Sequence, residues 1–256
     1  MSPSLFRVHP ITKRFGGLVA LQGASLTMET PSIQAVIGPN GAGKTTFFNC
    51  LTGIYVPDQG RVELSGRNLS NLPVHEVCRA GLARTFQNIR LFPEMTVLEN
   101  VLAGRFSHLH TGFFEALLRT RGYRAKESQA RDLARELLAF VGLSRHETQW
   151  ARNLPYGLQR RLEIARALAT EPKVLLLDEP GAGMNPQEVD ELIGLIGALR
   201  DRGIGVVLIE HHMKLVMDLA DSILVLDHGE PIASGTPGEI RTDERVIEAY
   251  LGKGSD

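Results

Sequence analysis

The segment that most constrains this chain is Gly38–Thr46, a glycine-rich loop between an apolar stretch and a helical pattern. It fits G-x-x-x-x-G-K-[ST], a pattern that wraps phosphate groups between a strand and a helix. The glycines let successive backbone N–H groups point at phosphate oxygens, Lys44 supplies a positive charge, and the Thr45 hydroxyl is a Mg²⁺ ligand. The loop predicts binding of a nucleoside triphosphate with Mg²⁺. The residues expected to contact it are Gly38, Pro39, Asn40, Gly41, Ala42, Gly43, Lys44, Thr45 and Thr46.

The residues around this loop predict an α/β fold. Ile33–Ile37 reads as a buried strand, and Thr45–Leu51 reads as a helix that ends at Thr52-Gly53. Two further runs, 174–178 and 205–210, are almost wholly apolar, as strands covered on both faces must be. Residues 222–227 and 230–235 flank His228-Gly229 and predict a hairpin near the end of the sheet.

Two regions lie outside this core pattern. The alternation in 5–15 and 21–29 predicts an antiparallel β layer before the nucleotide core. From about Leu98 to Gly142 the strand pattern stops, and an amphipathic helix is expected where apolar residues recur at helical spacing. Those residues are Ala130, Leu133, Ala134, Leu137, Leu138 and Val141. Nearby basic residues favour a solvated face over a lipid-binding one; they are Arg119, Arg121, Arg124, Lys126, Arg131 and Arg135.

The run Lys173–Pro180 carries a second chemical pattern, an apolar strand that ends in Asp178-Glu179. Such a strand places two carboxylates at the edge of the sheet beside the phosphate loop. Asp178 is expected to hold Mg²⁺ through water, and Glu179 is expected to polarise the water that attacks the γ-phosphate. The two motifs together predict hydrolysis as well as binding.

Composition sets the remaining bounds. The chain has 256 residues, of which 43% are hydrophobic and 22% charged, so it can bury a full core in water. A net charge of -1 gives no electrostatic reason to expect a nucleic-acid partner. Cys50 and Cys78 make no disulfide framework, which suits a reducing cytosol. No run approaches a membrane span and Met1–Ser4 begins no secretory signal, so we expect any membrane role to come through partner proteins.

At this point the sequence resembles the ATP-binding subunits of ABC transporters over nearly its whole length. Six segments occur in the family's order: Phe15-Gly16-Gly17, the phosphate loop, Thr85–Asn88, Leu154–Arg161, the strand ending in Asp178-Glu179, and Ile209–His212. The resemblance implies one ABC-type nucleotide-binding domain over 1–256. Residues 1–88 and 166–256 would form the antiparallel β subdomain and a RecA-like P-loop NTPase core. Residues 89–165 would form an inserted α-helical subdomain with the signature segment.

The resemblance also assigns roles to residues. Phe15 matches the aromatic residue that stacks on adenine, and Gln87 matches the glutamine that reaches Mg²⁺ and the γ-phosphate. His211 matches the histidine that contacts the γ-phosphate; His212 is its rival, and we favour His211 because it follows the strand directly. Glu179, His211 and Gln87 are therefore the expected catalytic residues. Thr45, Gln87 and Asp178, the last through water, are the expected metal site.

The signature segment departs from the family pattern. Most members have Leu-Ser-Gly-Gly-Gln, in which a serine caps a helix that points at the ATP of a second subunit; here the sequence is Leu154-Pro-Tyr-Gly-Leu158. Pro155 suits the first turn of a helix and leaves the N–H groups of Tyr156 and Gly157 available to a phosphate. Asn185 stands where the family has aspartate. These changes concern the partner's nucleotide rather than the chain's own.

A narrower resemblance is to the ATPase subunits of bacterial branched-chain amino-acid importers. It rests on Phe15–Leu21, Ala83–Phe92, Gln159–Arg166, Ala182–Pro186 and the closing Ala249–Gly252. It implies a second ATPase chain in a homo- or heterodimer, two membrane-spanning permease chains, an external solute-binding protein, and a place on the cytoplasmic face of the membrane. Alternatives are an importer of another solute, a regulatory nucleotide-binding module with weak turnover, and a mechanical ATPase for nucleic acid or ribosomes.

Overall fold

A computed structural model describes residues 4–105 and 121–251. The chain divides into two compact units, the first made of Met1–Arg84 with Lys173–Asp256 and the second of Thr85–Pro172. Residues 89–165, the predicted helical subdomain, fall within the second unit, and the functional division of the subdomains stays a prediction. Met1–Pro3, Arg119 and Gly252, which the sequence patterns include, lie outside the described residues, as do the side chains of Arg121 and Arg124.

A small antiparallel sheet begins the first unit, as the alternating sequence predicts. Its order is β2-β1-β4-β5, formed by β1 (Phe6–Phe15), β2 (Leu18–Met28), β4 (Val62–Leu64) and β5 (Arg67–Asn68). Phe6, Val8 and Ile11 of β1 are buried, and the residues between them face outward more. One face of this sheet therefore belongs to the core.

The larger sheet of the first unit places the ends of its parallel strands along one edge. Its order is β10-β9-β3-β8-β7-β6, with β9 and β10 antiparallel and the other neighbours parallel. Every residue of β3, β7 and β8 is buried, which is why these strands read as continuous apolar runs. The strands are β3 (Ile33–Ile37), β6 (Leu82–Arg84), β7 (Val174–Asp178), β8 (Gly205–Ile209), β9 (Ser222–Asp227) and β10 (Glu230–Gly235).

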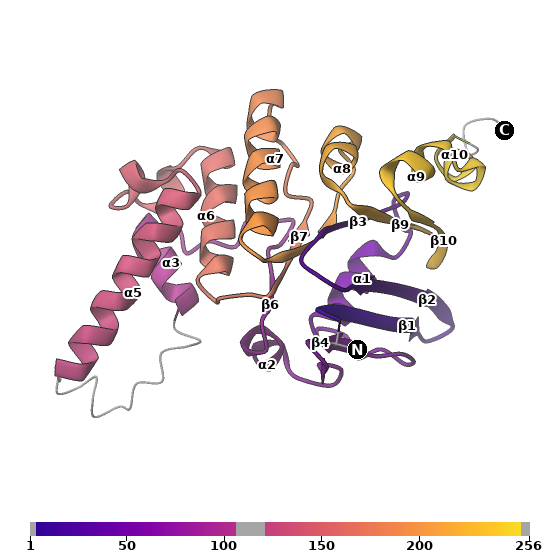
Figure 1. The fold of residues 1–256 in the computed structure, drawn as a ribbon, viewed down its shortest axis with the longest axis horizontal. Helices are drawn as coiled ribbons and strands as arrows, with labels where there is room; N and C mark the ends of the chain where they lie inside the picture. Colours follow the sequence, from indigo (N-terminus) through magenta and orange to yellow (C-terminus); the bar gives the residue numbers. More distant parts are fainter. Residues whose placement is uncertain (1–3, 106–120, 252–256) are drawn as a thin grey trace. The chain divides into compact units, whose positions relative to one another are not determined.

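Helices cover this sheet on both faces. Helix α1 (Lys44–Leu51) lies between the two sheets of the unit, where Phe47 and Phe48 are fully buried (Figure 1). Helices α7 (Pro186–Asp201) and α8 (Met213–Leu219) stand on the opposite side (Figure 1). The other helices in the described part of this unit are α2 (Val74–Arg79), α9 (Pro237–Thr242) and α10 (Glu244–Leu251). This arrangement confirms the α/β P-loop fold with its antiparallel β layer.

In the described residues of the second unit, the regular elements are helices. The unit contains α3 (Val97–Arg105), α5 (Arg121–Phe140), α6 (Tyr156–Leu168) and two 3₁₀ turns, η1 (Ser144–His146) and η2 (Ala151–Asn153). The apolar side of α5 is the one predicted, with Ala130, Ala134 and Leu138 buried. Lys126, Arg131 and Arg135 are exposed, and the choice between a solvated and a lipid-binding face stays a prediction. No helix in the described part of the chain is long and apolar enough to cross a membrane.

Two glycines of the first unit should respond oppositely to alanine. Gly38 has φ 149°, and an added Cβ would lie 2.0 Å from the Leu226 carbonyl oxygen, so Gly38→Ala should lower the free energy of unfolding by about 3 kcal/mol or more. Gly194 lies inside α7 with nothing near its Cβ position, so Gly194→Ala should raise it by about 0.5–1 kcal/mol. Urea unfolding curves test both; equal effects of the two substitutions would contradict the backbone argument.

Candidate functional site

The phosphate loop leaves β3 in the middle of the large sheet and runs into α1. Gly41 and Gly43 have φ of 82° and 97°, backbone conformations that glycine adopts without strain, and Gly43 is the N-cap of α1. The N–H groups of the first helical turn therefore point into the loop, where an anion is favoured. Thr45 is exposed in this first turn. The local structure is the phosphate cradle that the sequence predicts.

Lys44 is buried at the start of α1 and is held by the loop itself. Its Nζ donates to the carbonyl oxygens of Gly38 at 2.6 Å and Pro39 at 2.8 Å. Burial lowers the pKa of Lys44, and the nearby carboxylates of Glu179 and Asp178 oppose that shift. A phosphate group bound at the loop would likewise favour the charged form of Lys44, which burial disfavours.

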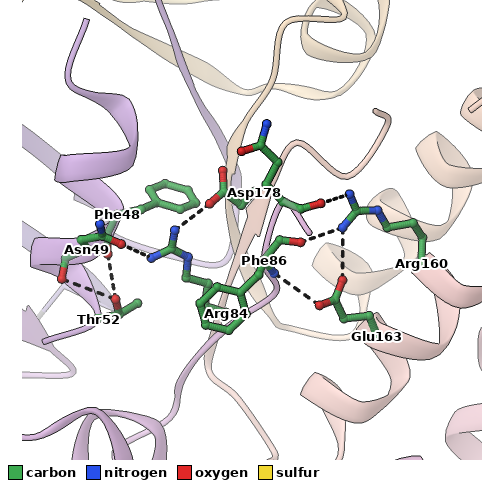
Figure 2. Close-up of polar contacts among 9 residues, drawn as sticks. Phe48, Asn49, Thr52, Arg84, Phe86, Arg160, Glu163 and Asp178 are labelled. Atoms are coloured by element: carbon green, nitrogen blue, oxygen red, sulfur yellow. Dashed lines mark hydrogen bonds and ion pairs between the residues drawn. The ribbon is translucent and has the colours of Figure 1, made fainter. Parts of the chain in front are cut away.

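Asp178, at the end of β7, is fixed by an arginine that the sequence patterns did not predict. Arg84 Nη2 lies 2.6 Å from Asp178 Oδ2, and both side chains are 6% exposed. Arg84 Nη1 also donates to Asn49 Oδ1 of α1 at 2.7 Å, and the guanidinium lies over the Phe48 ring (Figure 2). Because Arg84 uses Oδ2, the carboxylate is oriented and Oδ1 remains for hydrated Mg²⁺.

Glu179 follows Asp178 in a left-handed backbone conformation with φ 48°, which is uncommon outside glycine. Its backbone N–H still donates to Ile209 of β8 at 2.9 Å, so the turn begins where the strand ends. Glu179 Oε1 lies 3.1 Å from His211 Nε2, and the histidine side chain is 41% exposed. The backbone turn thus brings an acid and an imidazole together beside the phosphate loop.

Glu210 fixes the backbone of His211 through a hydrogen bond. It is a second residue whose role the sequence patterns did not predict. The carboxylate is 3% exposed. Its Oε1 accepts from the backbone N–H of Gly181 at 2.6 Å, and its Oε2 accepts from those of His211 and His212 at 3.0 and 3.1 Å. One carboxylate therefore joins the loop after Glu179 to the loop that carries His211.

The predicted adenine platform is at the end of β1. Phe15 is 43% exposed, as stacking on a base would require. Tyr55 contacts it edge-on with ring centroids 5.1 Å apart, and Lys13 Nζ lies 5.4 Å from its ring. Tyr55 was not predicted, because it lies 40 residues along the chain, in the turn after α1.

The other predicted site residues belong to the helical unit. Gln87 is exposed in the loop after β6, and Pro155 and Tyr156 are exposed while Gly157 is buried. Pro155 is the N-cap of α6, one position before the first turn in which the sequence predicts it; its ring fits the observed φ of -53°, and ψ is extended at 152°. The N–H groups of Tyr156 and Gly157 follow directly, in the turn that has no intrahelical acceptors.

The residues of the first unit suit Mg²⁺ bound by few protein ligands together with water and phosphate oxygens. Among the described residues no three His, Cys, Asp or Glu side chains are placed to hold a metal by themselves. Mg²⁺ commonly keeps several waters and is bound through one or two carboxylates plus phosphate oxygens. The exposed Thr45 hydroxyl and the second oxygen of Asp178 fit that mode, in which the metal would neutralise phosphate charge.

Arg84 and Glu210 were missed because each bonds to a residue far away in the sequence. Arg84 pairs with a residue 94 positions away, and Glu210 accepts from Gly181, 29 positions away. A charged residue at the end of an apolar strand run is the signal that marks Arg84 and Glu210, since such a charge needs a partner when it is buried.

Comparison with known proteins agrees with this geometry. A family model described as ABC transporter matches residues 21–182, and one described as branched-chain amino acid ATP-binding cassette transporter matches residues 230–256. The fold is similar to the crystal structure of the ADP conformation of MJ1267, an ATP-binding cassette of an ABC transporter. The TM-score is 0.85 and the identity 32%, covering 98% of this chain and 100% of that one. The chain therefore belongs to the ABC transporter family and is one of its ATPases.

Two curated relatives narrow the comparison further. BraF of Pseudomonas aeruginosa, a high-affinity branched-chain amino acid transport ATP-binding protein, is 48% identical over 254 residues. LivG of Salmonella typhimurium, with the same description, is 50% identical over 254 residues. Each match covers 99% of this chain and 100% of the relative. The similarity is thus to whole subunits and not to a shared domain alone.

The geometry of Glu210 makes a stability prediction. Glu210→Gln keeps the shape but turns an NH₂ group toward one of the backbone donors, leaving a buried N–H unpaired. We expect a loss of about 1–3 kcal/mol in the free energy of unfolding. Glu230→Gln, at an exposed carboxylate of β10, is the matched control and should change it little. Chemical unfolding curves decide; equal stabilities of the two variants would contradict the role of Glu210.

Proposed function

We propose that this chain is the ATP-hydrolysing subunit that drives uptake of branched-chain, hydrophobic amino acids through partner membrane subunits. The observation that carries the proposal is about 50% identity to branched-chain amino acid transport ATP-binding proteins over the whole chain. The match of residues 230–256 to a model of that group supports it independently of the phosphate loop. The solute itself would be selected by the membrane and binding subunits.

The proposed chemistry divides between the described residues. Phe15 stacks on adenine, Lys44 and the loop N–H groups bind the phosphates, and Thr45, Gln87 and Asp178, the last through water, hold Mg²⁺. Glu179 orients the attacking water, and His211, at 3.1 Å from it, donates to the γ-phosphate as charge develops there. Since Glu210 fixes the backbone of His211, the imidazole is held before the nucleotide arrives.

ABC ATPase subunits work as dimers with membrane permeases, and the proposal extends this to two ATPase chains, two permease chains and an external solute-binding protein. Pro155, Tyr156 and Gly157 would face the nucleotide of the second ATPase. ATP would close the pair, and hydrolysis would reopen it, which switches the permeases between access states. The subunit would lie on the cytoplasmic face of the membrane.

The docking surface for the permeases would be in the helical unit, near Arg90, Leu91, Phe92, Glu94 and Met95. Phe92 and Met95 are 47% and 39% exposed, and Trp150 adds a third apolar side chain at 44%. Trp150 pairs with Thr96 across an isolated bridge. Fully buried Asn100 bonds the N–H and carbonyl of Phe92 and the carbonyl of Thr96. A pre-formed apolar patch of this kind suits a membrane-protein partner.

Two substitutions separate binding from hydrolysis. Lys44→Ala should abolish detectable ATP binding because it removes the buried charge of the loop. Glu179→Gln should retain ATP binding but slow hydrolysis by about 100-fold or more, since it removes the group that activates water. Nucleotide-binding titrations and phosphate release measure the two effects, with Glu248→Gln, an exposed carboxylate of α10, as control. Rapid hydrolysis by Glu179→Gln would remove that residue from the proposed role.

Uptake and subunit composition test the transported solute. Tagged protein purified from its native membranes should bring down two permease chains and a second ATPase chain. Cells that carry Lys44→Ala should lose uptake of labelled leucine, isoleucine and valine, while glutamate uptake is unchanged. Unchanged leucine uptake, or recovery of ribosomes or nucleic acid in place of membrane chains, would overturn the proposal.

A further inference from the structure

A buried arginine of α6 contacts two segments that the proposed function assigns to different nucleotides. Arg160 is 3% exposed in the helical unit. It donates to the Phe86 carbonyl at 2.7 Å (Figure 2). It also donates to the Gln87 carbonyl and, at 3.0 Å, to the Tyr156 hydroxyl. One guanidinium thus bonds the backbone on which Gln87 stands and the first residue of the signature helix.

Glu163, one turn further along α6, holds the same loop from its N–H side. Its Oε2 lies 3.2 Å from Arg160 Nη1, and its Oε1 accepts weakly from the N–H of Phe86 at 3.5 Å (Figure 2). The same Oε1 accepts from the N–H of Arg90 at 3.3 Å. The loop 86–90 is therefore tied at both its carbonyls and its N–H groups. Its shape depends on two side chains of α6 and not on sheet pairing.

Burying the charges of Arg160 and Glu163 costs free energy, which indicates that the pair does more than fill space in the core. The two side chains are only 3% and 2% exposed. Burial raises the pKa of Glu163, against the opposing effects of Arg160 and the two N–H donors. Buried ion pairs often stabilise no better than apolar residues of the same size. An arginine with five donors in a fixed plane does, however, fix several acceptors relative to one another, which a lysine cannot.

We propose that Arg160 and Glu163 are positioning residues that hold the Gln87 loop and the start of the signature helix as one body. This rests on the proposed roles of Gln87 and Tyr156. When the chain's own nucleotide draws Gln87, the signature segment offered to the partner's nucleotide moves with it. The two ATP sites of a dimer are then coupled through this buried pair of side chains.

The position of the loop along the chain supports this role. Arg84 is the last residue of the first unit and Thr85 the first of the second. Arg84 is bonded to Asn49 and Asp178 within its own unit, and Arg160 bonds Phe86, two residues later. The chain is therefore anchored immediately on each side of the crossing, and only Thr85 lies between the anchors.

Amide hydrogen exchange on the full chain tests the coupling directly. Arg160→Lys keeps the charge but cannot bond two carbonyls and Tyr156 together in one plane. We expect exchange to speed up at least about fivefold in both Phe86–Arg90 and Gln159–Leu162. In the assembled transporter, kcat for ATP should fall about tenfold because Gln87 is misplaced, with KM within about twofold. Arg135→Lys, which alters an exposed arginine–glutamate pair of the same unit, should change none of these.

The outcomes separate this proposal from the proposed function. Faster exchange in only one segment, in neither, or in both with kcat unchanged would overturn the positioning role. If the wild-type complex showed neither ATPase activity nor amino-acid uptake, the proposed function would be wrong. The hydrogen-exchange data would still test the role of Arg160. If Arg160→Lys fails to fold, the double variant Arg160→Met, Glu163→Met removes both charges without leaving one unpaired. It should show the same loss of protection in both segments, and protection retained in either would overturn the proposal.

Discussion

The site depends on one constraint, that charges removed from water must be given fixed partners. Lys44 has two loop carbonyls, Asp178 has Arg84, and Glu210 has three backbone N–H groups. Each partner satisfies a desolvated group and also fixes where it points. Chemistry on a triphosphate requires donors and acids that are already oriented, so the rules of burial and the needs of catalysis select the same arrangement.

In the helical unit, the partners of the buried polar side chains are backbone groups of nearby loops. Its described residues form no strand, and apart from the isolated bridge between Thr96 and Trp150, buried side chains help to fix its loops. Asn100 bonds the loop that carries Phe92, and Arg160 with Glu163 bonds the loop that carries Gln87. A loop fixed in this way has a defined shape and few contacts of its own. When one end of such a loop moves, the whole loop moves with it, whereas a loop bonded only to water would deform instead.

The sequence predicted those parts of the molecule that depend on local pattern. Continuous apolar runs indicated β3, β7 and β8, and glycines with a lysine indicated the loop between β3 and α1. The roles of Arg84, Glu210 and Tyr55 were not predicted, because they depend on residues that only the fold brings close. Asp178 and Gly181 are two of these residues. No periodicity encodes a contact across 94 positions. The single hint of these roles was a charge or aromatic ring where the local pattern gives no reason for one.

The departures at the signature segment and at Asn185 have a common explanation in backbone chemistry. Asn185 accepts from the N–H of Glu188 at 3.0 Å, and Glu188 accepts from that of Asn185 at 2.9 Å, so it caps α7 as an aspartate would. At α6, Gln159 Nε2 donates to the Leu154 carbonyl at 2.8 Å, across Pro155. The helix start is thus fixed without a serine hydroxyl, and its first N–H groups remain available to an anion. The sequence gives up a hydroxyl at Pro155 and a negative charge at Asn185, while the starts of both helices stay fixed.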